Sequence, residues 1–154
     1  MAERPADLRL DAFLPYRLSI VSNRVSDAVA TTYSALFGLR IPEWRLVAVL
    51  AEGDGLSQQA LGRKTRMDKV TVSRAAIALA GRGLIVREAD ASDKRAARLS
   101  LTEAGRDLYA QVAPKALAIE AELFGAFSDA ELTAFGDMLD RIEAAAAKLD
   151  SDGR

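Results

Sequence analysis

The sequence of 154 residues contains no cysteine and no histidine. Without cysteine, the chain can form no disulfide, no thiol nucleophile and no cysteine-ligated zinc site. Without histidine, it lacks the side chain that most often serves as a general base near neutral pH, and also the commonest metal ligand. These absences argue against most hydrolytic and metal-assisted chemistry. We therefore expect a protein with no enzymatic activity, no cofactor and no metal.

Long apolar runs are also missing from the sequence. No stretch approaches the ~18 apolar residues that a membrane span needs, and the N-terminus does not have the basic and then apolar pattern of a signal peptide. We therefore expect a cytoplasmic protein. Half of the residues are apolar and 28% are charged, which is typical of a globular chain, and the length favours one compact domain.

The formal net charge of −1 conceals an uneven distribution. Residues 63–98 contain ten Lys or Arg and four Asp or Glu, a net charge of +6, whereas residues 99–154 carry a net charge of −6. A basic segment inside an acidic chain is typical of a surface that binds a polyanion. The alternative is a basic face that is merely solvated.

Apolar residues recur every three or four positions in several segments, which predicts helices. Ser57, Asp68 and Ser128 are suitable N-caps for three of them, and Ser128 forms a capping box with Glu131. Residues 1–12 are polar and are expected to form a flexible arm. The predicted helices span residues 14–37, 42–52, 58–65, 69–82, 102–127 and 129–149.

The apolar pattern changes its period after residue 83. Residues 84–86 and 98–101 are short β-rich runs that flank a charged segment, which predicts a β-hairpin with an exposed tip. Two short helices with a tight turn between them, followed by such a hairpin, make a winged helix-turn-helix. The predicted fold is therefore mainly α, with about six helices and a two-stranded β-hairpin wing.

The second of those two short helices has a polar outer face. Val72 and the alanines that follow Arg74 point to the core, which leaves the remaining side chains of its first half outside. Such a face can enter the major groove and offer donors to guanine and phosphate, and methyl groups to thymine. The alternative is an ordinary amphipathic helix. The candidate DNA-binding residues in and around these helices are Ser57, Arg66, Lys69, Val70, Thr71, Ser73 and Arg74.

The tip of the predicted hairpin adds Asp93, Lys94 and Arg95 to these candidates. A thin loop that carries arginine can reach a narrow minor groove, where the negative potential is concentrated. Asp93 would hold Arg95 in position through a charge-assisted hydrogen bond. The alternative is a surface salt bridge of little energetic value.

The sequence resembles the MarR family of bacterial transcription regulators. The resemblance rests on Asp93-Lys94-Arg95, on Leu101-Thr102-Glu103-Ala104-Gly105 and on the joint Arg82-Gly83-Leu84-Ile85. It implies a homodimer that binds a pseudo-palindromic operator, with the helices of residues 13–38 and 102–150 at the dimer interface and residues 42–101 as the DNA-binding module. The residues themselves also favour a dimer. The apolar stripes of the first and last helices are longer than that module can cover, and a second copy of the chain would bury them.

The resemblance further implies a pocket for a small organic effector, aromatic or anionic in character. Arg17, Asn23 and Trp44 are the candidate effector-binding residues. The sequence thus predicts a sequence-specific regulator of transcription that binds double-stranded DNA, a repressor released by its effector. The alternative is a winged-helix module that binds another protein and has no specific DNA site.

Overall fold

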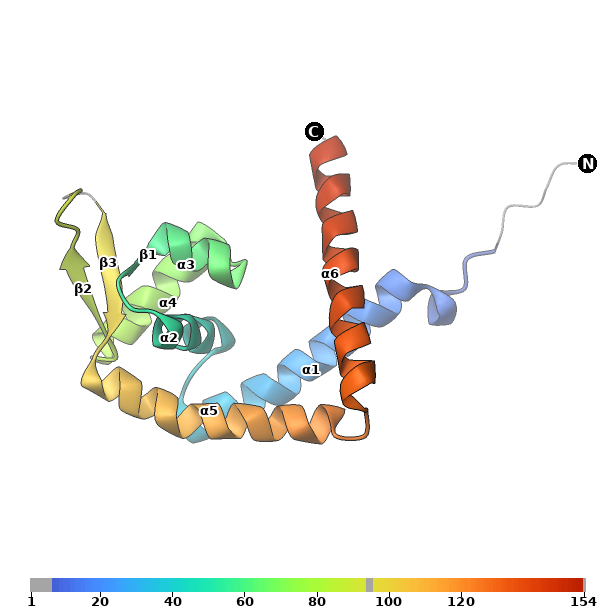
Figure 1. Cartoon of the computed structure of the whole chain (residues 1–154), viewed down its shortest axis with the longest axis horizontal. Coiled ribbons are helices and arrows are strands. Elements are labelled where there is room, and N and C mark those ends of the chain that lie inside the picture. Colours follow the sequence, from blue (N-terminus) through green and yellow to red (C-terminus); the bar gives the residue numbers. More distant parts are fainter. Residues whose placement is uncertain (1–6, 94–95, 154) are drawn as a thin grey trace, which may run out of the picture. The chain divides into compact units, whose positions relative to one another are not determined.

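The computed structural model describes residues 7–93 and 96–153. It is mainly helical with a small antiparallel sheet, as the sequence predicts (Figure 1). Within the described residues, no helix combines the length and the apolar character that crossing a bilayer requires. The elements in chain order are η1 (Leu10–Ala12, a 3-10 helix), α1 (Leu14–Phe37), α2 (Ile41–Glu52), β1 (Leu56–Ser57), α3 (Gln58–Thr65), α4 (Lys69–Gly81), β2 (Ile85–Ala89), β3 (Ala97–Leu101), α5 (Glu103–Phe124) and α6 (Asp129–Asp152).

The chain divides into two compact units, Met1–Pro114 and Lys115–Arg154. The division falls inside α5, directly after Pro114, which cannot donate a backbone hydrogen bond within the helix. The first unit contains every element up to the first half of α5. The second contains the rest of α5 and all of α6.

The predicted helix caps are confirmed. The Ser57 hydroxyl accepts a hydrogen bond from the backbone N–H of Ala60 at 3.1 Å. Ser128 and Glu131 form the reciprocal capping box, with distances of 3.2 and 2.8 Å. These bonds satisfy N–H groups that the first turn of a helix leaves without a partner. Gly38 ends α1 in the left-handed conformation, at φ 61°, which glycine adopts without steric cost.

Part of the predicted N-terminal arm has regular structure. Residues Leu10–Ala12 form η1, closed by a hydrogen bond from the Phe13 N–H to the Leu10 carbonyl. Arg9 and Asp11 form an exposed ion pair at 3.1 Å. Residues 1–6 of the arm lie outside the described residues.

The sheet has the strand order β1-β3-β2. Strand β2 pairs with β3 from Ile85 opposite Leu101 to Ala89 opposite Ala97, so it extends three residues beyond the predicted run. Strand β1 pairs with the other edge of β3 and adds a third strand that the sequence analysis does not predict. The wing is therefore anchored on a sheet of three strands.

The core of the first unit joins α2, α3, α4 and the sheet. Helix α4 buries Val72, Ala75, Ala76 and Leu79, which confirms its predicted inner face. Because these side chains are small near the middle of α4, neighbouring helices can pack closely against it. The other buried apolar side chains of the unit include Tyr33, Leu39, Leu46, Val47, Leu50, Leu61, Leu84, Ile85, Leu99, Leu101 and Val112.

The second unit has no comparable core. Helix α6 contains no buried residue. The Phe124 ring lies 6.4 Å from Phe127 and 6.2 Å from Phe135, and these rings line an apolar hollow of about 380 Å³ together with Leu132 and Met138. Helix α5 ends at Phe124, three residues earlier than predicted, because a turn closed by the Phe127 N–H on the Phe124 carbonyl precedes the Ser128 cap.

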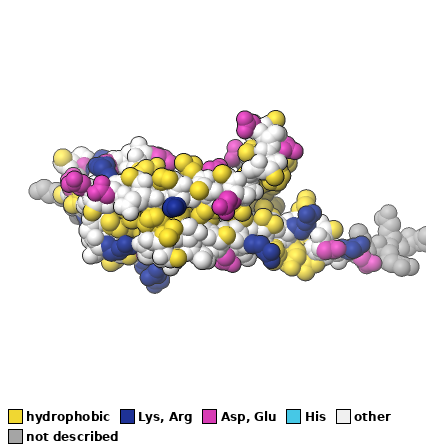
Figure 2. Space-filling model, turned by 90° about the horizontal axis from the view of Figure 1, so that it is seen from below, with side chains coloured by type: hydrophobic (Ala, Val, Ile, Leu, Met, Phe, Trp, Pro, Cys, Tyr) yellow, Lys and Arg dark blue, Asp and Glu magenta, His cyan; other side chains and the backbone are white. Residues whose placement is uncertain are grey.

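Large apolar side chains are also exposed on α1. They follow one another from the start of the helix and include Leu14, Leu18, Ile20 and Val21. Figure 2 shows hydrophobic side chains exposed over one face of the molecule, among charged groups that stand apart. Exposure on this scale is unusual for a soluble monomer.

Candidate nucleic-acid interface

Helices α3 and α4 are joined by a tight turn. Arg66 ends α3 in the left-handed conformation, at φ 58°, and Asp68 then caps α4. Gly62 permits this close approach, because a Cβ there would lie 3.3 Å from the Met67 carbonyl oxygen and 3.8 Å from Val72. The turn therefore fixes the position of the first residues of α4.

Asp68 holds the first turn of α4 with both carboxylate oxygens. Oδ1 accepts from the Thr71 N–H and Oδ2 accepts from the Thr71 hydroxyl, each at 2.8 Å. Both bonds lower the pKa of Asp68, and the bond from the Thr71 backbone N–H has the larger effect. They also occupy the hydroxyl proton of Thr71, so in this conformation that side chain presents its methyl group and its oxygen lone pairs to a ligand.

The outer face of α4 has the expected residues. Lys69, Val70 and Arg74 are exposed, and Ser73 is half-buried between them and the core. One turn further along, Ile77 is 65% exposed. Sequence reasoning did not include Ile77 in the outer face, although its spacing of seven from Val70 places both on one side of a helix.

The wing projects from strands β2 and β3. Lys94 and Arg95, two of its candidate DNA-binding residues, lie outside the described residues. Asp93 is exposed, and its backbone carbonyl accepts a hydrogen bond from the Ala96 N–H at 3.1 Å. The predicted support of Arg95 by Asp93 therefore stays a prediction.

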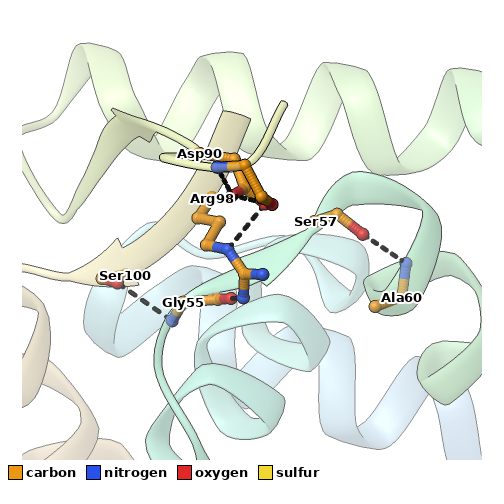
Figure 3. A network of polar contacts seen from close by, with 7 residues as sticks. Gly55, Ser57, Ala60, Asp90, Arg98 and Ser100 are labelled. Carbon is orange, nitrogen blue, oxygen red and sulfur yellow. Dashed lines mark hydrogen bonds and ion pairs between the residues drawn. The ribbon is translucent and has the colours of Figure 1, made fainter. Parts of the chain in front are cut away.

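A different ion pair joins the two sides of the wing. Arg98 Nε donates to Asp90 Oδ2 at 2.9 Å, and Arg98 Nη1 donates to the Gly55 carbonyl at 2.8 Å (Figure 3). Hydrogen bonds from the Ser92 N–H and hydroxyl, and then the Arg98 guanidinium, lower the pKa of Asp90 to about 2. The sequence could have indicated this pair, because Asp90 and Arg98 lie on opposite sides of the predicted hairpin tip.

At least two of the described cations of the basic segment are engaged within the fold. Besides Arg98, the Arg82 guanidinium donates to the carbonyls of Phe37 and Gly38 at 3.1 and 3.2 Å. The charge available to a polyanion is smaller than the composition indicates. Exposed cations remain in the last turn of α3, at the start of α4 and on β2, namely Arg63, Lys64, Lys69, Arg74 and Arg87.

A hollow of about 380 Å³ lies beside α4, between its first turns and the start of α2. Arg40 and Arg74 contribute to its lining, together with Thr71 and the carboxylate of Glu43. Glu43 is buried, and its Oε2 accepts from the Arg40 N–H at 3.0 Å as part of the α2 capping box. Arg40 is thereby a cation close to the outer face of α4 that sequence reasoning missed, because it lies outside the basic segment.

The candidate effector residues do not lie in one place within the chain. The Trp44 ring stacks on Tyr109 at 5.9 Å and contacts Tyr33 at 5.4 Å. Tyr33 is buried, which raises the pKa of its phenol. Arg17 and Asn23 are exposed on α1, at about 24 and 15 Å from Tyr33 along the helix at ~1.5 Å per residue. Within the described residues, no group of three or more acidic side chains is placed to hold a metal ion.

Comparison with known proteins adds a family match. Residues 37–96 match the model of the MarR family. The transcriptional regulator HosA of Escherichia coli O157:H7 is 30% identical over 94 residues, which are 61% of this chain and 70% of that protein.

Solved structures match over most of the chain. A MarR family transcriptional regulator from Silicibacter pomeroyi is 30% identical, with a TM-score of 0.75, and the match covers 93% of this chain and 96% of that one. CouR from Rhodococcus jostii RHA1, solved bound to p-coumaroyl-CoA, is 26% identical, with a TM-score of 0.79 and coverage of 88% and 95%.

Proposed function

Because the chain belongs to the MarR family of transcriptional regulators, we propose that it binds double-stranded DNA of a defined sequence and represses transcription there. The observation that carries this proposal is the first half of α4. It follows a tight turn, is capped by Asp68 and exposes Lys69, Val70 and Arg74. A helix with such an outer face can enter the major groove and contact base edges with its N-terminal residues.

In the proposed complex, the contacts divide into three groups. Lys69, Ser73 and Arg74 offer donors to base edges and phosphates, while Val70 and the Thr71 methyl group contact thymine. Ser57 and Arg66, at the two ends of α3, contact the backbone. Residues 93–95 of the wing enter the adjacent minor groove, with Arg95 as the residue that reaches its floor.

We propose that the protein acts as a homodimer. The exposed apolar residues of α1 and of the second unit support this, since a second copy would cover them. One reading helix also makes too few contacts for a specific site. A two-fold axis requires operator half-sites about 10 base pairs apart, one turn of the duplex.

The proposed regulation is release of DNA by a small organic effector, aromatic or anionic in character. The aromatic cluster of Tyr33, Trp44 and Tyr109 supports an aromatic ligand, and CouR is a relative solved with the thioester of an aromatic acid. Arg17 and Asn23 remain candidate polar contacts. A thermal-shift screen of aromatic acids and their coenzyme A thioesters tests this, followed by DNA binding with each compound that raises Tm.

Fluorescence anisotropy with duplexes from the region upstream of the protein's own gene tests the proposed function. The expected result is binding at least about 10³-fold tighter than to a scrambled duplex of equal length, with an affinity that falls steeply as salt rises. Equal affinity for both duplexes would leave only non-specific binding. No binding to either would favour the alternative, a winged-helix module that binds protein. The proposal includes no enzymatic activity.

A further inference from the structure

Arg98 occupies the centre of the sheet that carries the wing. It lies on the middle strand β3, opposite Ser57 of β1 on one side and opposite Glu88 of β2 on the other. A single side chain at this position can reach both neighbouring strands.

The Arg98 guanidinium makes use of this position. Its Nε binds the Asp90 carboxylate, at the end of β2, and its Nη1 binds the Gly55 carbonyl, just before β1 (Figure 3). The two bonds point to opposite sides of β3, so they join the wing tip to the turn that precedes α3. A planar guanidinium with several fixed donors is suited to such a bridge, whereas a lysine ammonium is not.

Each end of the bridge is itself held. On the wing side, Asp90 Oδ1 accepts from the Ser92 N–H at 2.9 Å and from the Ser92 hydroxyl at 2.7 Å, and the Asp90 N–H donates to the Ala96 carbonyl at 3.0 Å. Asp90 thereby fixes both sides of the tip. The segment 93–95, with the candidate minor-groove residue, lies between these anchored positions.

On the helix side, the Gly55 N–H donates to the Ser100 hydroxyl and to the Leu99 carbonyl, each at 3.0 Å. Gly55 has a φ of +73°, a conformation that a residue with a side chain rarely adopts, so glycine suits this position. Two residues later, Ser57 caps α3. A continuous set of bonds therefore runs from the wing tip through Arg98 to the start of the helix-turn-helix.

We propose that Arg98 is a positioning residue that fixes the wing relative to α3 and α4, and that its charge does not contact DNA. The inference rests on the proposed function. The three-stranded sheet holds the base of the wing, but the end of the hairpin beyond the ladder depends on the bonds of Asp90. Without this bridge, that end would have to be ordered when DNA binds, at a cost in affinity. The competing possibility is that Arg98, whose side chain is 53% exposed, binds a phosphate directly.

The sign of the effect of Asp90→Asn separates these two roles. If Arg98 positions the wing, Asp90→Asn and Arg98→Gln each weaken operator binding by about tenfold. The double variant then binds as well as the single variant that has the lower affinity, because both substitutions remove the same bridge. If Arg98 binds a phosphate, removal of the neighbouring negative charge by Asp90→Asn strengthens binding. Arg98→Lys, which retains the charge without the two-sided geometry, should bind more weakly than wild type under the positioning role.

Salt dependence supplies a second readout. The slope of log K against log salt should be the same for wild type, Arg98→Gln and Asp90→Asn. Loss of a phosphate contact would instead reduce the slope by about 0.9. Arg45→Gln on α2 removes the same charge at an exposed position outside the proposed interfaces and controls for net charge.

The experiment is anisotropy with the full-length protein and its operator duplex at several salt concentrations, with thermal unfolding of each variant alongside. If Arg98→Gln fails to fold, the sign of the Asp90→Asn effect still decides. Three results would each overturn the inference and leave the proposed function intact. They are wild-type affinity for the operator in both single variants, a smaller salt slope for Arg98→Gln than for wild type, and tighter operator binding by Asp90→Asn. Absence of specific binding by wild type would overturn the proposed function, and the inference with it.

Discussion

Arg82, at the C-terminal end of α4, caps the C-terminal end of α1: its Nη1 donates a hydrogen bond to the Gly38 carbonyl at 3.2 Å. A second bond, from Nη2, reaches the Phe37 carbonyl at 3.1 Å. These are carbonyls that the last turn of a helix leaves without an intrahelical partner, and a cation is favoured there by the helix dipole. One side chain thereby joins the proposed reading helix to α1.

Replacement of Arg82 by Gln should lower the free energy of unfolding by about 1 kcal/mol, since two charge-assisted bonds at a largely exposed site are lost. Urea denaturation followed by circular dichroism measures this. Arg87→Gln is the matched control, because Arg87 is also exposed and belongs to the same basic segment. Equal denaturation midpoints for the two variants would contradict the capping role of Arg82.

Gly105 should tolerate no side chain. A Cβ at this position would overlap the carbonyl oxygen of Leu84 and lie 3.2 Å from the Leu101 side chain. We expect Gly105→Ala to destabilise the fold by about 2 kcal/mol or more. Gly53→Ala is the control, with an expected change within about 0.5 kcal/mol, because a Cβ there meets nothing within 4 Å. Wild-type stability of Gly105→Ala would show that the start of α5 and Leu84 are not in close contact.

Ser73 and Lys69 should differ in what they contact. If Ser73 reads bases, Ser73→Ala lowers affinity for the operator more than for random duplex. If Lys69 binds a phosphate, Lys69→Ala lowers both equally and reduces the salt slope by about 0.9. Anisotropy titrations of both duplexes across a salt series measure these effects. Unchanged operator affinity in both variants would remove the first half of α4 from the interface.

The Asp90 carboxylate predicts a specific pH dependence. Its pKa falls from the ordinary value of 3.8 to about 2 in the folded protein. A group whose pKa is lowered by folding stabilises the fold above its unfolded pKa, and this contribution is lost as the pH falls through the folded pKa. The Tm of Asp90→Asn should therefore lie below that of wild type at pH 7 and pH 5, and the difference should shrink between about pH 4 and pH 2. A difference that is constant over this range would contradict the shift.

The proposed dimer can be tested on α6. Ile142 is exposed in the protomer, and burial of a carboxylate in an apolar interface is costly, so Ile142→Asp should give a monomer in sedimentation experiments and weaken operator binding. Asp140→Asn changes a charged residue of the same helix and should leave the mass unchanged. A wild-type protein that is itself monomeric at micromolar concentration would contradict the dimer.

The helices were predictable because their ends are encoded locally. Ser57, Asp68 and Ser128 each cap within three residues along the chain, and the inner face of α4 follows from the spacing of its apolar residues. Strand β1 was not predictable. It has two residues and no periodicity, and it exists because Leu56 pairs with Leu99, far along the sequence.

The polar contacts of the wing show the same limit. Sequence reasoning named only Asp93 as an acid that holds an arginine of the wing, and it did not find the ion pair that joins Asp90 to Arg98. Which acid faces which base across a hairpin depends on the strand register and on the length of the turn. Here β2 extends to Ala89, so Asp90 comes directly after the last residue of the ladder.

Hydrogen–deuterium exchange of the full-length protein with and without its operator duplex tests the central claim most directly, since it reports which segments the DNA covers. The proposed interface predicts slower exchange with operator at the start of α4 and in the wing segment 90–96, and smaller changes with a scrambled duplex at the same concentration. Protection confined to other segments, or identical protection by both duplexes, would contradict recognition of DNA by α4 and the wing.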